Sequence, residues 1–159
     1  MLRRLLKRLT VDVATRGESS GASTAKLLSG EVVVERWRSR GETKEAALAL
    51  TVAQVRALEG LVRDDPGWTR LQTLVGRAGD PWNAFDWPAG FDPLILCAPL
   101  CQRVAFECRQ CPVGQVQGRS CSDPVTDIGS ILGLIGRAER AALLVHLDRL
   151  RAHLTAMTP

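Results

Sequence analysis

All five cysteines of this 159-residue chain lie between positions 97 and 121, spaced C-x3-C-x6-C-x2-C-P-x8-C. They are Cys97, Cys101, Cys108, Cys111 and Cys121. Thiolates gathered in space bind metal ions or metal clusters, and a C-x2-C step supplies two of them within one turn. If these thiols share one ion, the chain around them must fold back on itself. No other sequence feature constrains the fold as strongly.

The start of the chain, MLRRLLKRLTV, is basic and amphipathic. It lacks the uninterrupted apolar run and small-residue cleavage site of a secretory signal, so we expect a cytoplasmic protein with reduced thiols. We expect this segment to pack as a helix on the domain, the alternatives being a contact with a membrane surface or acidic partner, or a disordered tail. An odd number of cysteines also argues against a complete disulfide framework. Metal binding is therefore favoured, with disulfide-bonded or metal-free cysteines as the alternative.

Helix geometry limits how the thiols can meet. On one straight helix Cys97 and Cys111 would lie about 21 Å apart, whereas zinc–sulfur bonds are about 2.3 Å long. A single site therefore requires a break between Cys101 and Cys108. A helix with the first two cysteines would then face a turn with the next two. Pro112 and Gly114 are suited to ending that turn, and Gly118 to returning Cys121 toward the other thiols.

The string CAPLCQRVAFECRQCPVGQVQGRSCSDP resembles a cysteine cluster of short, uncharacterised prokaryotic and phage proteins. That pattern is close to C-x2-C-x6-C-x2-C-P, followed by a glycine and a further cysteine before a proline. The matching positions are Cys101, Cys108, Cys111, Pro112, Gly118, Cys121 and Pro124. Cys97 departs from the pattern because the first gap holds three residues. The resemblance implies metal binding only and attaches no particular activity to it.

Four thiolates suit zinc in a closed tetrahedral site, and an iron–sulfur cluster is the alternative cofactor. The preferred ligands are Cys101, Cys108, Cys111 and Cys121, while Cys97 either replaces one of them or lies buried and inert. The two histidines, His146 and His153, are one heptad apart, or about 10.5 Å along a helix, and cannot share one zinc ion. We interpret them as ordinary residues on the polar flank of a helix.

The fold prediction is α+β, with a small antiparallel β-hairpin and helices in the N-terminal half. Residues 10–15 are a possible strand. EVVVERWRS is rich in β-branched residues and KEAALAL alternates, so the two predict a hairpin around a turn at 40–42. Thr51 and Gln54 form a capping-box pattern that opens a helix. A second helix is predicted from Asp65-Pro66 to Gly79.

The C-terminal half is predicted to be helical with a cysteine-rich loop. Apolar stripes recur at helical spacing after Pro124 and in a final segment. Their residues are Ile128, Ile131, Leu132 and Ile135, then Leu143, Leu147, Leu150 and Leu154. We divide the chain into a strand-hairpin-helix unit (1–79), an aromatic and proline-rich connector (80–93) and a cysteine-rich helical region (94–159). We expect these parts to form one compact domain.

No catalytic motif is recognisable, so a non-enzymatic role is favoured. The leading hypothesis is a metal-stabilised interaction or regulatory protein that binds another protein. The alternatives are an iron–sulfur electron-transfer protein and a metal-free helical protein with buried cysteines; a thiol enzyme comes last. The net charge of +4 permits nucleic-acid binding through Arg36, Trp37, Arg38 and Arg40 but supports it weakly. The C-terminal leucine stripe could pair two copies, and no apolar run is long enough to span a membrane.

Overall fold

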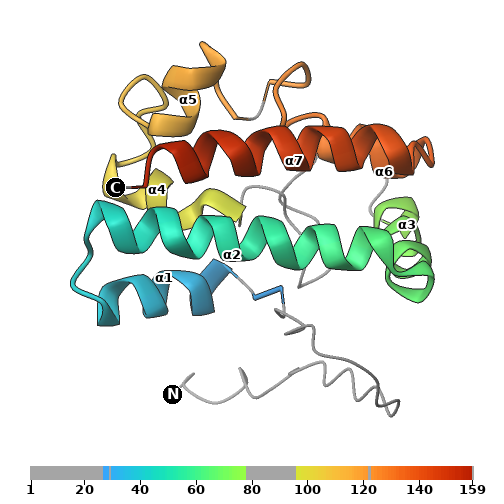
Figure 1. Cartoon of the computed structure of the whole chain (residues 1–159), viewed down its shortest axis with the longest axis horizontal. Helices are drawn as coiled ribbons and strands as arrows, with labels where there is room; N and C mark the ends of the chain where they lie inside the picture. The colour runs from blue at the N-terminus through green and yellow to red at the C-terminus, as the bar shows by residue number, and fades with distance from the viewer. Residues whose placement is uncertain (1–26, 29, 78–95, 122, 159) are drawn as a thin grey trace, which may run out of the picture.

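The computed structural model describes residues 27–28, 30–77, 96–121 and 123–158. Of these residues 71% are helical and none is in a strand, so the α+β prediction is wrong and the described fold is all-α. The helices are α1 (Gly30–Ser39), α2 (Lys44–Arg63), α3 (Asp65–Arg77), α4 (Ala98–Arg103), α5 (Pro112–Gln117), α6 (Ile131–Gly136) and α7 (Arg140–Ala156). The long helices α2 and α7 lie side by side, with α1 along the other side of α2 (Figure 1).

The first strand of the predicted hairpin, EVVVERWRS, forms α1 instead. Its buried residues are Val33, Val34 and Trp37, which share one face of a helix. Gly41 has φ +80° and follows the helix as its left-handed cap, donating to the carbonyl of Arg38 at 3.0 Å. The predicted turn at 40–42 is therefore real, but it joins two helices. A short β-branched run does not distinguish strand from helix once packing selects one face.

The second predicted strand, KEAALAL, is the start of α2. Thr43 caps this helix by accepting a hydrogen bond from the Ala46 N–H at 3.1 Å. The predicted capping box is wrong, because Thr51 lies buried inside α2 and donates to the Ala47 carbonyl at 2.9 Å. The Gln54 side chain instead bonds both backbone groups of Leu28, at 3.0 and 2.8 Å. Alanine, leucine, glutamate and lysine favour a helix over a strand here.

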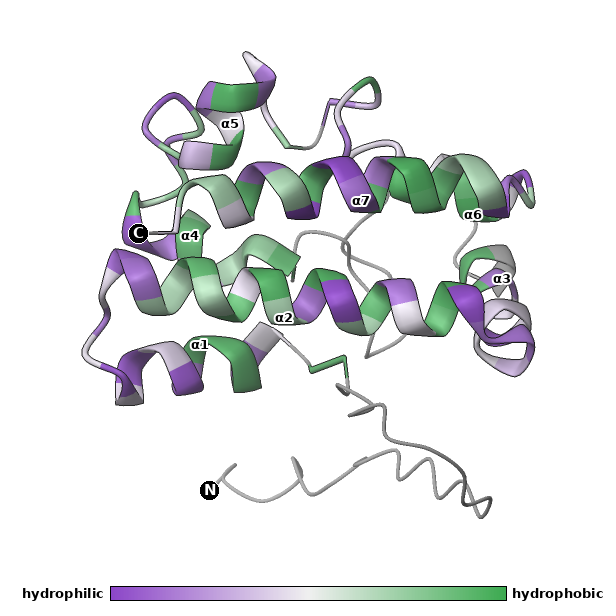
Figure 2. Ribbon diagram, viewed as in Figure 1, coloured by the Kyte–Doolittle hydropathy of each residue, from purple (hydrophilic) through white to green (hydrophobic). Residues whose placement is uncertain are grey.

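The C-terminal leucine stripe is confirmed as the buried face of α7. Leu143, Leu147, Leu150 and Leu154 are all at most 2% exposed. Apolar residues recur along α2 and α7 with polar residues between them (Figure 2). One buried cluster includes residues from α1, α2, α3, α6 and α7 together with the cysteine region. The leucines predicted as a possible dimer seam are therefore used within the chain.

Helix α3 begins at Asp65, and the Asp64 side chain caps it by accepting the Gly67 N–H at 2.9 Å. Its buried residues include Trp68, Leu71 and Val75. The helix is described as far as Arg77, and its predicted end at Gly79 lies outside the described residues. The predicted N-terminal helix, the possible strand at 10–15 and the connector at 80–93 also lie outside them.

Candidate metal centre

The chain breaks between Cys101 and Cys108, as the distance argument predicted. Helix α4 ends in a Schellman motif, in which the Phe106 N–H donates to the Cys101 carbonyl at 2.8 Å and the Ala105 N–H to the Gln102 carbonyl at 3.1 Å. Ala105 and Phe106 have φ of +49° and +64°, the left-handed region that L-residues seldom adopt. This pair of residues turns the chain back so that Cys108 returns toward the end of α4.

A second short helix holds the fourth cysteine. Pro112 begins α5 and Cys111 is its N-terminal cap, so the turn that carries Cys108 and Cys111 ends at Pro112 by starting a helix. A side chain at Gly114 would place its Cβ 2.1 Å from the Cys108 carbonyl oxygen, so only glycine allows this approach. Gly118 ends α5 with φ +65° and returns the chain toward Cys121, as predicted.

Four thiols lie in mutual contact. The sulfur atoms of Cys97 and Cys101 are 3.6 Å apart. Cys97 also contacts Cys121, and both Cys101 and Cys121 contact Cys111. The four therefore form a closed chain of contacts that includes Cys97, which the sequence pattern left in doubt.

These contacts set the ionisation of the thiols. Hydrogen bonds from Cys101 and Cys121 lower the pKa of Cys111, and the backbone N–H groups of Gly114 and Val113 lower it further. Donation to Cys111 raises the pKa of Cys101 and of Cys121 to about 12. The hydrogen bonds of Cys97 to Cys101 and Cys121, together with its burial, raise its pKa well above the usual value. These contacts therefore favour the thiolate form of Cys111 over that of the other three cysteines.

The fifth thiol lies beside this group. The Cys108 sulfur is 3.4 Å from the Ser120 hydroxyl and interacts electrostatically with Cys101. Cys108 shares a cavity of about 140 Å³ with three of the other thiols. The cavity is lined by Cys101, Val104, Phe106, Cys108, Cys111, Ser120 and Cys121. The four preferred ligands of the sequence prediction therefore surround one cavity, and Cys97 lies outside its lining.

The thiols lie close together, but their sulfur atoms are not placed in the geometry of a metal site. Within the part of the chain that the structure describes, no three cysteine, histidine, aspartate or glutamate side chains are already arranged to hold a metal ion. No disulfide joins any two of the five cysteines, all of which the structure describes. Both histidines lie on α7, and the Nδ1 atom of His146 is 2.8 Å from the Asp127 carboxylate, in agreement with a role on the polar flank.

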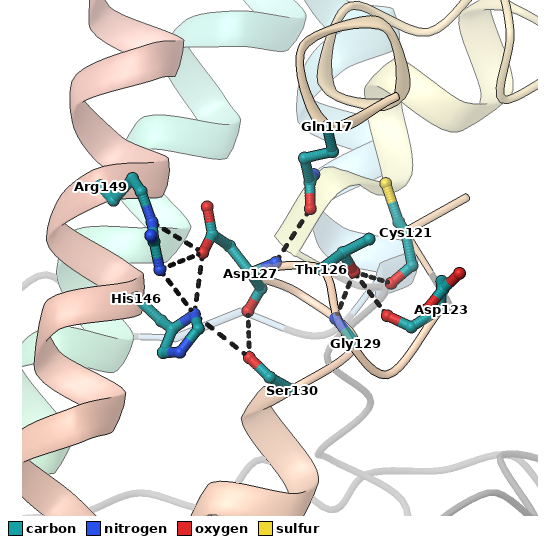
Figure 3. Close-up of polar contacts among 9 residues, drawn as sticks. All are labelled: Gln117, Cys121, Asp123, Thr126, Asp127, Gly129, Ser130, His146 and Arg149. Atoms are coloured by element: carbon teal, nitrogen blue, oxygen red, sulfur yellow. Dashed lines mark hydrogen bonds and ion pairs between the residues drawn. The ribbon is translucent and has the colours of Figure 1, made fainter. Parts of the chain in front are cut away.

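A polar network that the sequence did not predict anchors the backbone of Cys121 (Figure 3). The Thr126 hydroxyl donates to the backbone oxygens of Cys121, at 3.1 Å, and Asp123, at 2.8 Å. It also accepts the Gly129 N–H at 3.0 Å. The run DPVTDIGS, which is rich in turn-forming residues, was the available signal for this arrangement. The turns fix the backbone from which the Cys121 thiol projects toward the cluster.

The segment considered for nucleic-acid binding, residues 36–40, is only partly exposed. Trp37 is 4% exposed, and its ring N–H donates to the Thr43 carbonyl at 2.9 Å. The neighbouring side chains of Arg36, Arg38 and Arg40 are exposed. The tryptophan therefore belongs to the core and cannot stack on a base, although the arginines remain a positive surface.

Comparison with known proteins finds no matching family model, no matching curated protein and no matching solved structure. The resemblance of the cysteine pattern to prokaryotic and phage proteins thus stays a prediction. Among the described residues, no helix is both long and apolar enough to cross a bilayer.

Proposed function

We propose that this chain is a cysteine-ligated zinc protein, with Cys97, Cys101, Cys111 and Cys121 as ligands. The observation that carries the proposal is the 3.6 Å separation of the Cys97 and Cys101 sulfur atoms within the closed chain of thiol contacts. In a tetrahedral site with bonds of about 2.3 Å, sulfur atoms lie about 3.8 Å apart. Cys97 thus replaces Cys108 in the ligand set that the sequence favoured.

The ionisation of the cluster supports binding of a divalent cation. The Cys111 thiolate is already stabilised by two backbone N–H groups and two thiol donors. Its thiol donors would lose their protons to the solvent as the metal bound, because the thiolate is the ligating form. A buried zinc ion would then replace three weak S–H contacts with direct bonds. This exchange favours zinc over the metal-free cluster.

The role of such a metal would be structural. Its ligands would join α4, the cap of α5 and the loop that leads into α6. Helix α4 packs on α1 and α2, while α5 packs on α7. Structural zinc sites contribute on the order of 10 kcal/mol to folding in small domains. We therefore propose a metal-stabilised interaction or regulatory protein, whose exposed arginines on α1 would contact an acidic region of a protein partner.

An iron–sulfur cluster is the second candidate, because one observation favours it. The cavity of about 140 Å³ is much larger than one coordinated ion needs, and four cysteines line it. In this case Cys108 would be a ligand and Cys97 would not. The resulting protein would transfer electrons or sense redox conditions.

Two matched variants separate the candidates. The full chain is purified without oxygen, and its zinc, iron and absorption spectrum are measured. Zinc binding predicts a colourless protein that loses its metal in Cys97→Ser and keeps it in Cys108→Ser. An iron–sulfur cluster predicts absorption near about 400 nm and the opposite response of the variants. A wild-type chain with neither metal, whose helical content survives chelation, would contradict both and favour metal-free buried cysteines.

A further inference from the structure

The five thiols differ in their access to solvent. Cys97, Cys111 and Cys121 are buried, at 0%, 2% and 4% exposure. Only Cys101 and Cys108 are partly exposed, and both line the same cavity. A small reagent entering from solvent would therefore meet these two sulfur atoms first.

The backbone holds these two cysteines close together. The Cys101 carbonyl accepts the Phe106 N–H in the Schellman motif, so the chain reverses at Ala105 and Phe106, one helical turn after Cys101. The two thiols interact electrostatically. Phe106, between them in sequence, is 70% exposed and lines the cavity. Two left-handed residues in succession at 105 and 106 impose strain, and such strain is often kept where a reactive site needs it.

We propose that Cys108 is a modification site for hydroperoxides, and that its oxidation joins it to Cys101 and releases the zinc ion. This inference rests on the proposed zinc site. Cys108 is the cysteine outside the proposed ligand set, so its sulfur is not occupied by the metal. Cys101 is the one partly exposed residue among the proposed ligands, so its sulfur is the ligand atom that a reagent from solvent can reach.

The reaction balances in two steps. The Cys108 sulfur attacks the O–O bond of the hydroperoxide, which forms a sulfenic acid and releases an alcohol, or water from hydrogen peroxide. The Cys101 thiolate then attacks the sulfenic sulfur, which forms the disulfide and, with one proton, releases water. Two electrons pass from the two sulfur atoms to the peroxide. A zinc ion held at the site would lose Cys101 as a ligand and would therefore dissociate more readily.

The test uses the full chain loaded with zinc. Zinc content is measured first, hydrogen peroxide is then added, and release is followed with a colorimetric zinc indicator. Peptide mapping by mass spectrometry identifies the disulfide. We expect wild type to release its zinc as a disulfide between Cys101 and Cys108 forms. Cys108→Ser and Cys108→Ala should bind as much zinc as the wild type before peroxide is added. Afterwards they should release it at least about tenfold more slowly than the wild type.

The outcomes separate the two proposals. Release from both Cys108 variants at the wild-type rate would overturn the redox proposal, as would a disulfide between another pair of cysteines. Full zinc loading followed by resistance of wild type to peroxide would overturn it and leave the zinc site intact. A chain that does not take up zinc before peroxide is added would contradict the proposed function itself, and the release step with it.

Discussion

The Asp127 carboxylate lies 2.8 Å from the Nδ1 atom of His146, and this contact joins the loop after Cys121 to helix α7. Arg149 donates to the same carboxylate oxygen at 3.0 Å. The Asp127 N–H donates to the Gln117 side chain at 2.9 Å, which ties the loop to the end of α5 as well. Asp127 thus holds the segment after Cys121 to α7 through its carboxylate and to the end of α5 through its backbone N–H (Figure 3).

Asp127→Ala should lower the free energy of unfolding by about 1–3 kcal/mol, because the substitution removes the buried, charged acceptor that His146 and Arg149 share. It should also weaken metal binding by loosening Cys121. Asp148→Ala is the control, since Asp148 forms an exposed ion pair with Arg151 on the same helix. Such pairs contribute about 0–1 kcal/mol. Urea unfolding measures both variants, and equal losses would contradict a special role for Asp127.

The interface of α2 and α7 contains a second partly buried ion pair. Arg151 donates to Glu59 at 3.0 Å, and Glu59 is 8% exposed. Arg151→Met should cost about 1–3 kcal/mol because it leaves the Glu59 carboxylate without its cation. Adding Glu59→Leu should recover most of that loss, since an apolar pair needs no compensation. A double variant no more stable than Arg151→Met in chemical unfolding would refute this account.

Two glycines in helices should respond in opposite directions to alanine. Gly114→Ala forces a Cβ to within 2.1 Å of the Cys108 carbonyl, so α5 must shift and carry Cys111 with it. We expect a loss of about 1–3 kcal/mol. Gly60 in α2 has no atom within 4 Å of its Cβ position, and Gly60→Ala should stabilise by about 0.5–1 kcal/mol. Thermal unfolding distinguishes the two, and a neutral Gly114→Ala would show that α5 is free to move.

The parts of the structure that were predictable follow from strict geometry. The four leucines of α7 recur at helical spacing over about three turns, which a strand cannot accommodate. The break between Cys101 and Cys108 follows from helix length alone. The hairpin prediction failed because Val32, Val33 and Val34 favour strands locally, while the buried face shared with Trp37 depends on contacts with α2 and α4.

The thiol set shows the same limit of sequence reasoning. Spacing along the chain describes separation and not depth, so Cys97 looked like the exception to the pattern. Its complete burial arises from packing of distant segments around α4. Likewise, the contact between Asp127 and His146 joins residues 19 positions apart, and no local motif indicates it. Tertiary contacts of this kind decide which cysteines meet.

The ionisation of the cluster predicts how the stability of the metal-free, reduced protein depends on pH. The thiols of Cys101 and Cys121 have pKa values raised to about 12, against 9.0 in an unfolded chain. Between these values the unfolded state releases protons that the folded state retains, so stability falls as pH rises from 9.0 toward about 12. The lowered pKa of Cys111 has the opposite sign, so stability rises with pH below 9.0. The contribution of the cysteines to stability should therefore be greatest near pH 9.0.

Urea unfolding of the metal-free protein at a series of pH values tests this profile. The double variant Cys101→Ser/Cys121→Ser is the control, because serine does not ionise in this range, and its alkaline loss should be smaller than that of wild type. Zinc should remove the alkaline loss as well, because bound thiolates have already released their protons. A wild-type stability that stays level or rises above pH 9 would show that the thiols do not donate to one another as the structure indicates.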